Sequence, residues 1–305
     1  MDRITDKVRA TLKSQDTEGR FELYFTRTPG YLWALFFKAL HVHPIAVTLM
    51  SIVIGAASGW CFYSEDIRLT LLGMLLLTWA NWYDCADGQL ARMTGQKTLI
   101  GRILDGFAGD VWFFCIYLAI TLRLTGQWGP AIWVLAAWAG LRCHSRQCAI
   151  ADYYRNIHLL FLLGKGKSEL DTSQQLSAEY ASMAWCSKQW FHKLYLFFYI
   201  RYTRGQERLT PCFQRLHSAI QERWAGDLPE RLRQDFRRDS LPLMPVTNIL
   251  TFDTRVAVLY ASLLAGMPWI YFVFEATVLE LLRYRMTRTH EAFCAKYTNE
   301  LDTYL

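Results

Sequence analysis

The sequence has 305 residues, of which 52% are hydrophobic and 15% aromatic, and its formal net charge is +6. Its apolar residues form long blocks instead of recurring at a helical period, which favours several membrane-spanning helices over a soluble globular fold. The eight cysteines include no CxxC pair, so we expect small buried side chains in a reducing compartment and no zinc site.

The first 43 residues contain two short amphipathic stretches, one around 8–12 and one around 21–40. The second is typical of a helix that lies in the membrane interface. The chain opens without the apolar core and cleavage site of a signal peptide, so none is expected.

Six apolar segments follow, and each predicts a transmembrane helix. They lie at about 44–63, 69–93, 98–124, 127–150, 249–265 and 267–286. The predicted fold is therefore an all-α polytopic membrane protein with six transmembrane helices.

The basic residues are distributed unevenly around these segments. With the amino terminus inside, three short segments face outward: 64–68, 123–129 and 266–268. They hold only Arg68 and Arg123 of the 33 lysines and arginines. This positive-inside bias explains the net charge by topology, so no nucleic-acid partner is expected. It also places residues 81–110 at the cytoplasmic face, in a bacterial inner membrane.

Residues 151–245 form a polar insertion between the fourth and fifth predicted helices. Its apolar core, 194–200, has seven residues and is too short to cross a membrane. The basic part at 204–238 fits a solvated face against anionic lipid better than nucleic-acid binding. The chain therefore divides into four segments: 1–43, interfacial; 44–150, helices one to four; 151–245, a cytoplasmic helical insertion; and 246–305, helices five and six with the C-terminal tail.

The most informative residues lie at the inner end of the second predicted helix. Asp84 and Asp87 are three residues apart and share one helix face. Gly88 allows a ligand or a backbone to approach closely, and Arg92 can bind a phosphate in bidentate fashion. Carboxylates at the edge of a hydrocarbon layer are costly, which indicates a functional site.

The third predicted helix repeats this arrangement with Gly101 and Asp105. Two antiparallel helices would then present Asp84, Asp87 and Asp105 to one point. Hard divalent cations prefer such oxygen ligands, and Mg²⁺ often adds phosphate oxygens of a substrate. The pattern predicts a metal-dependent phosphoryl-transfer site. The alternative is a set of polar contacts between helices, with Arg92 and Arg102 as counter-ions.

This stretch resembles the signature of the CDP-alcohol phosphotransferase family, D-x2-D-G-x2-A-R-x8-G-x3-D-x3-D. The positions that match in identity and spacing are Asp84, Asp87, Gly88, Ala91, Arg92, Gly101 and Asp105. The resemblance covers about 30–150 and 246–286. It implies a six-helix unit, a homodimer, and two Mg²⁺ or Mn²⁺ ions held by the three aspartates. It further implies that the glycine, alanine and arginine positions seat the CDP group.

The fourth aspartate of the signature is the family's base, which deprotonates the acceptor hydroxyl. Here position 109 is glycine, and the carboxylate follows one residue later at Asp110. On a regular helix Asp110 would be turned by about 140° from Asp105. We therefore predict an extra-residue π-bulge between these two aspartates that restores Asp110 as the catalytic base. Gly106 and Gly109 would make that distortion inexpensive.

The start of the first predicted helix departs from the family more mildly. The family often has Pro-Asn-x2-Thr there, and this chain keeps Pro44 and Thr48 but has Ile45 in place of the asparagine. Thr48 is expected either to line the nucleotide pocket or to be a helix-interior threonine.

Three arginines could hold an anionic acceptor beside the carboxylates. Arg142 and Arg146 are one helical turn apart near the end of the fourth predicted helix, and Arg255 lies at the inner start of the fifth. Their alternative role is to extend toward lipid headgroups.

These features predict a metal-dependent phosphotransferase of phospholipid synthesis. It would transfer a phosphatidyl group from CDP-diacylglycerol to a polar hydroxyl acceptor, such as inositol phosphate or glycerol phosphate, and release CMP. Its partners would be the CDP-linked lipid, the polar alcohol and membrane lipids. Two alternatives remain: a CDP-choline or CDP-ethanolamine enzyme acting on diacylglycerol or ceramide, and an inactive membrane scaffold.

Overall fold

The computed structural model describes residues 8, 14, 16–17, 19, 21–164, 170–184, 190–224 and 228–304, with the side chain of residue 99 left out. Helices make up almost all of these residues, and no strand occurs among them. The predicted all-α class is therefore confirmed. The first amphipathic stretch falls largely outside the described residues.

The chain forms two compact units, each assembled from segments that are distant in sequence. The first unit contains Met1–Ser145 and Phe252–Val278, and the second contains Arg146–Thr251 and Leu279–Leu305. The predicted insertion thus shares a unit with the C-terminal helix, while its cytoplasmic location stays a prediction.

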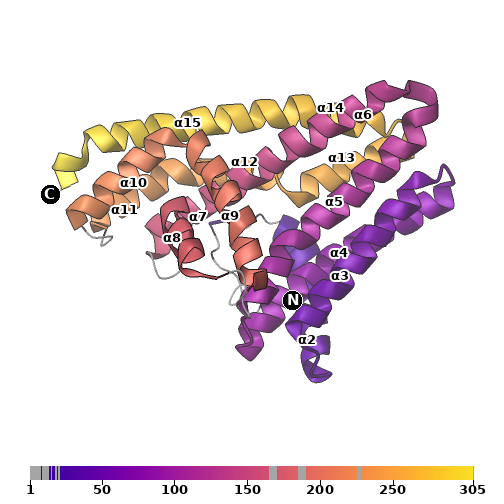
Figure 1. Ribbon diagram of the computed structural model, residues 1–305, viewed down its shortest axis with the longest axis horizontal. Helices are drawn as coiled ribbons and strands as arrows, with labels where there is room; N and C mark the ends of the chain where they lie inside the picture. The colour runs from indigo at the N-terminus through magenta and orange to yellow at the C-terminus, as the bar shows by residue number, and fades with distance from the viewer. Residues whose placement is uncertain are drawn as a thin grey trace. The chain divides into compact units, whose positions relative to one another are not determined.

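In the first unit α3 packs against both α4 and α5, and α2 packs against α4 (Figure 1). Its helices are α2 (Thr28–Ala39), α3 (Pro44–Tyr63), α4 (Ile67–Thr94), α5 (Leu99–Trp128), α6 (Pro130–Ala137), α13 (Phe252–Leu264) and α14 (Trp269–Phe274). Three π-helical segments accompany them: Glu22–Arg27, Trp138–His144 and Glu275–Leu279.

The turn between α4 and α5 positions the predicted site. Helix α4 ends at Gly95, whose φ of 70° lies in the left-handed region that glycine adopts without steric cost. Helix α5 begins after Thr98, whose hydroxyl oxygen accepts a hydrogen bond from the Gly101 amide at 3.0 Å. The left-handed Gly95 and the extended Thr98 thus reverse the direction of the chain between the aspartate pair and Asp105.

Helix α3 packs closely against both α4 and α5 because small residues face its neighbours. A Cβ atom at Gly55 would lie 2.1 Å from the Trp112 ring, and one at Gly59 would lie 2.8 Å from the Cys115 backbone. The buried cluster that surrounds this contact draws on the helices α3, α4, α5, α6, α13 and α14. Its aromatic members are Phe62, Trp112, Phe113, Tyr117, Tyr271 and Phe272.

Large apolar side chains also cover the outside of the first unit. Trp60 and Leu141 are 79% and 78% exposed, and Val53 and Phe114 are more than half exposed. Two helices, Pro44–Tyr63 and Ile100–Trp128, are long and apolar enough to cross a membrane by length and composition. The count of six transmembrane helices stays a prediction.

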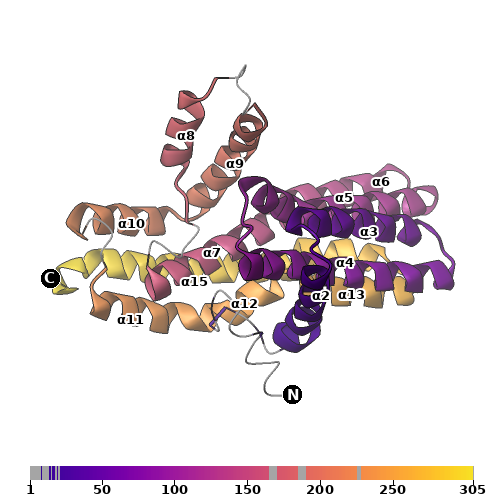
Figure 2. The same ribbon diagram turned by 90° about the horizontal axis from the view of Figure 1, so that it is seen from below.

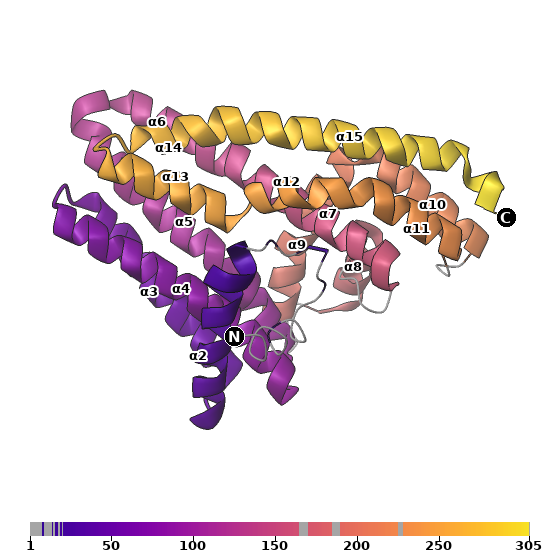
Figure 3. The same cartoon turned by 180° about the vertical axis from the view of Figure 1, so that it is seen from behind.

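The second unit is built from α7 (Ser145–Leu163), α8 (Ser173–Ser182), α9 (Trp190–Leu209), α10 (Pro211–Trp224), α11 (Glu230–Ser240), α12 (Met244–Ile249) and α15 (Glu280–Asn299). Helices α8 and α9 lie side by side (Figure 2), and α15 packs along α10 (Figure 3). Stacked rings connect the helices in the core of this unit. The ring centroids of Phe161 and Phe236 are 3.6 Å apart, and those of Tyr154 and His290 are 3.9 Å apart.

The contact between α3 and α5 gives a stability prediction. In Gly55→Val the new side chain must displace the buried Trp112 ring, and such overpacking costs about 1–3 kcal/mol. We expect a lower unfolding temperature in detergent. In Gly126→Ala, where a Cβ meets nothing within 4 Å, stability should be unchanged or raised. Equal stability of wild type and Gly55→Val would contradict the close helix contact.

Candidate active site

Three carboxylates meet where α4 ends and α5 begins. Ligand oxygens of Asp84, Asp87 and Asp105 all lie within 4.8 Å of one another. Asp84 and Asp87 come from one face of α4, and Asp105 lies almost two turns into α5 after the reversal at Gly95. The structure therefore brings together the three residues for which the sequence predicted metal binding.

The surroundings of this triad suit a divalent cation. The carboxylate of Asp87 is almost completely buried, at 3% exposure, and Asp84 is half-buried. One Asp84 carboxylate oxygen, Oδ1, is buried and has no hydrogen-bond partner among the described residues. Three clustered carboxylates repel one another, and an all-oxygen donor set is what hard cations require. The residues present therefore fit a divalent metal ion.

Thr48 orients the most buried of these carboxylates. It lies on α3 with 2% exposure, and its hydroxyl donates a hydrogen bond to Asp87 Oδ2. The sequence left Thr48 between a pocket residue and a helix-interior threonine. In the structure it contacts a predicted metal ligand directly, and such outer partners fix the orientation of ligands.

Arg92 and Gly88 belong to the same side of α4. A Cβ atom at Gly88 would lie 3.3 Å from Nη1 of Arg92, so the glycine leaves space for the guanidinium. Arg92 interacts electrostatically with Asp87 and Asp105, and its buried Nε has no hydrogen-bond partner among the described residues. Ala91 is half-buried beside it, and Gly101 forms the first turn of α5. This arrangement places a cation next to the triad, where an anionic group could bind.

Arg27 is a second cation near the triad that the sequence did not reveal. It ends the π-helical segment Glu22–Arg27, and its Nη2 lies 3.0 Å from Glu22 Oε1. Its guanidinium interacts electrostatically with Asp84, and its carbonyl accepts a hydrogen bond from Gln89 at 3.1 Å. The signal was hidden because a basic residue in an interfacial helix is explained equally well by topology.

The predicted bulge beside Asp110 is wrong. Helix α5 is a regular α-helix from Leu99 to Trp128, so Asp110 is turned by about 140° from Asp105. A Cβ at Gly106 or Gly109 would meet nothing within 4 Å, so no packing contact at either glycine favours an inserted residue. Asp110 is exposed and interacts electrostatically with His144.

A π-helical segment occurs instead after α6. The segment Trp138–His144 directly follows that helix, and Gly140 within it faces the Tyr117 ring, where a Cβ would come within 3.2 Å. The extra residue therefore lies where a bulky aromatic side chain of α5 occupies the space. It brings His144 into the core at 7% exposure.

The three predicted acceptor arginines differ in their surroundings. Arg142 is exposed, and its guanidinium lies 6.0 Å from the centroid of the Trp138 ring. Arg255 is completely buried, with Nη1 2.5 Å from Glu275 Oε1 and 3.0 Å from His144 Nδ1. Arg146 belongs to the second unit. Binding of an acceptor by Arg255 would require it to exchange Glu275 for that ligand.

Glu275 is the centre of a buried polar network that the sequence did not predict. Besides Arg255 and His144, the hydroxyls of Tyr117 and Tyr271 donate hydrogen bonds to its carboxylate. Glu275 is 0% exposed and lies in the π-helical segment Glu275–Leu279. A lone glutamate inside an apolar run was the available signal, because such a residue needs buried partners.

The geometry thus defines a site of three clustered carboxylates with two arginines in electrostatic contact with them. Residues 41–158 match the model of the CDP-alcohol phosphatidyltransferase family. The chain carries a CDP-alcohol phosphatidyltransferase domain over these residues, which confirms the predicted resemblance and indicates a phosphotransferase enzyme. A comparison with curated proteins gives no match.

The matched range contains the whole aspartate triad together with Thr48, Arg92 and Asp110. The family acts with a CDP-linked substrate and an alcohol acceptor, is generally integral to membranes and generally depends on divalent metal. Most of the second unit lies beyond residue 158 and is left unexplained by the match.

The contact between Thr48 and Asp87 predicts a metal-binding defect. Thr48→Val keeps the side-chain shape but removes the hydroxyl that orients Asp87. Loss of such an outer partner typically costs about 10–100-fold in metal affinity or activity. Mn²⁺ binding measured by electron paramagnetic resonance should weaken by that amount. Thr121→Val is the matched control, because the hydroxyl of this buried threonine donates to the Tyr117 carbonyl of its own helix. Wild-type affinity in Thr48→Val would refute this role.

Proposed function

We propose that the protein transfers a phosphatidyl group from CDP-diacylglycerol to the hydroxyl of a polar alcohol and releases CMP. The observation that carries this proposal is the carboxylate triad within 4.8 Å, inside the matched domain. We expect a multi-pass homodimer of six-helix units in a bacterial inner membrane, with this site at the cytoplasmic face. The positive-inside charge distribution supports that orientation.

Asp84, Asp87 and Asp105 would hold the metal, which we expect to be two Mg²⁺ or Mn²⁺ ions. When bound, the metal would neutralise the diphosphate and the charge that develops on the leaving group. Asp84 offers an unpartnered oxygen for this purpose, and Thr48 keeps Asp87 in a fixed orientation. The residues that seat the cytidine diphosphate would be Thr48, Gly88, Ala91, Arg92 and Gly101.

The reaction is a substitution at the phosphorus next to the lipid. The acceptor oxygen forms a new bond to that phosphorus while the bond to the CMP phosphate breaks, and the electron pair leaves with CMP. Arg92, half-buried beside Asp87, would bind the diphosphate and the departing phosphate. The acceptor proton must pass to a base or to water.

The acceptor would be a polar alcohol that carries a phosphate, such as inositol phosphate or glycerol phosphate. Arg142 supports this choice because it is an exposed arginine of the first unit, and Arg146 and Arg255 are further candidates. A CDP-choline or CDP-ethanolamine enzyme would instead need an open aromatic cage. The rings next to the triad pack on each other, with Trp33 5.1 Å from Tyr83 and Tyr83 5.1 Å from Phe37, between centroids.

Release of CMP from CDP-diacylglycerol tests the proposal. Purified protein in detergent should release CMP in the presence of Mg²⁺ and an acceptor, and inositol phosphate, glycerol phosphate, inositol and serine would be compared. Chelation of Mg²⁺ or Asp87→Asn should abolish the release, because either change removes the metal site. Acceptor-dependent release from CDP-choline with diacylglycerol, and none from CDP-diacylglycerol, would replace the proposal with the headgroup reaction.

The role of Asp110 has its own test. Removal of a general base typically costs about 10²–10⁴-fold in rate. Because α5 is regular and Asp110 is turned away from the triad, we expect Asp110→Asn to retain activity within about tenfold, whereas Asp105→Asn should lose it. A loss for Asp110→Asn in the larger range would re-establish Asp110 as the predicted base.

A further inference from the structure

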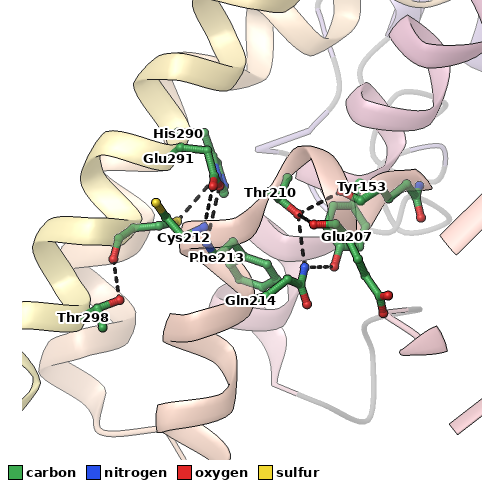
Figure 4. A network of polar contacts seen from close by, with 11 residues as sticks. Tyr153, Glu207, Thr210, Cys212, Phe213, Gln214, His290, Glu291 and Thr298 are labelled. Carbon is green, nitrogen blue, oxygen red and sulfur yellow. Dashed lines mark hydrogen bonds and ion pairs between the residues drawn. The ribbon is translucent and has the colours of Figure 1, made fainter. Parts of the chain in front are cut away.

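A second cluster of metal-ligating side chains lies in the second unit, on α15. The sequence His290-Glu291-Ala292-Phe293-Cys294 places the first and last of these residues one helical turn apart on one face. Donor atoms of His290, Glu291 and Cys294 all lie within 4.8 Å of one another. Figure 4 shows His290 and Glu291 directed toward the start of α10.

The distances in this cluster suit a tetrahedral ion. The His290 Nδ1 atom lies 3.5 Å from Cys294 Sγ and 3.8 Å from Glu291 Oε1. A zinc ion with bonds of about 2.0–2.1 Å to nitrogen and about 2.3 Å to sulfur holds those two atoms about 3.5 Å apart. For nitrogen and oxygen the separation is about 3.4 Å, so a small rotation of the Glu291 carboxylate completes the fit.

We take Cys212, from another helix, as the fourth donor of the proposed site. It lies in the first turn of α10, its backbone amide donates a hydrogen bond to the Glu291 carboxylate, and it interacts electrostatically with Cys294. With Cys212 included, the donor set is two sulfur atoms, one imidazole nitrogen and one carboxylate oxygen. Soft thiolates combined with imidazole select zinc over Mg²⁺ or Ca²⁺. The absence of a CxxC pair hid this set, since the fold brings the two cysteines together from different helices.

The ligands are held in place by a surrounding shell. Oε2 of Glu291 accepts a hydrogen bond from the Cys212 amide at 2.6 Å, and Oε1 accepts one from the Phe213 amide at 3.4 Å. The His290 ring is stacked on Tyr154 with an interplanar angle of 11°. Such contacts orient metal ligands before the ion binds. The capping of α10 explains Glu291 by itself, but it does not explain a histidine and the Cys294 thiol beside the same carboxylate.

We propose that His290, Glu291, Cys294 and Cys212 bind one Zn²⁺ ion that fastens α15 to the start of α10. The site is separate from the carboxylate triad in residues and in donor chemistry. Its role is structural: it joins the C-terminal helix to the helical insertion within the second unit. Nothing in the proposed transfer reaction depends on it.

Metal analysis of the purified full-length chain tests the proposal. After purification with Zn²⁺ and removal of loosely bound metal, elemental analysis should give one zinc per chain. Replacement by Co²⁺ should produce the near-ultraviolet charge-transfer absorption of a thiolate–cobalt bond. Both signals should persist in Asp87→Asn, which alters only the carboxylate triad, and this separates the zinc site from the proposed activity.

Variants then assign the ligands. Cys294→Ser and His290→Gln should each lower zinc affinity at least tenfold, whereas Cys115→Ser, a cysteine of α5, should not change it. Zinc should raise the unfolding temperature of wild type but not of Cys294→Ser. If these variants do not fold, Glu291→Gln keeps one oxygen that can accept a helix-capping hydrogen bond and should still weaken zinc. Either of two results would overturn the proposal. One is that the Co²⁺-loaded wild type shows no thiolate–cobalt absorption, and the other is that none of the three ligand variants changes the affinity for zinc.

Discussion

Mutual repulsion among three carboxylates is the constraint around which the first unit is arranged. Asp84, Asp87 and Asp105 are brought within ligand distance by a left-handed glycine and a capping threonine at one turn. Such proximity costs free energy unless cations or hydrogen-bond donors are near. The fold supplies both from separate elements: a hydroxyl from α3 and guanidinium groups from α4 and from the N-terminal π-helical segment. The site therefore depends on four elements although its ligands come from two.

The buried charge of Glu275 depends on a different structural feature, the π-helical segments. Glu275 and His144 both lie in π-helical segments, where one extra residue per turn shifts the side chains that follow onto another face. In each case the shift directs a polar group inward, toward Arg255 and two tyrosine hydroxyls. An ion pair at 0% exposure is stable only when its remaining bonding capacity is also satisfied. The π-helical segments thus turn Glu275 and His144 toward the core, which a regular helix would not do at these positions.

The sequence predicted the triad well because its signal is local. A spacing of three residues on one helix, a glycine turn and a third aspartate on the next helix determine the geometry almost by themselves. The bulge beside Asp110 was predicted by analogy with a motif, but a register shift requires a packing partner, and the structure has one at Gly140 instead. Arg27 and the approach of Cys212 to the cluster around His290 could not be found because each depends on contacts between distant segments. The all-α class followed from apolar blocks alone.

The network around Glu275 constrains how the protein can change over time. Four side chains from four separate segments contact one carboxylate, and three of them donate hydrogen bonds to it. Replacing Glu275 alone would therefore leave the buried Arg255 without its counter-ion. Replacing Arg255 alone would leave an unneutralised carboxylate beside two phenols. Related sequences should therefore keep or exchange these positions as a group, with apolar residues substituted at all of them together. Covariation at Tyr117, His144, Arg255, Tyr271 and Glu275 would then trace the ancestry of this helical arrangement independently of the aspartate motif.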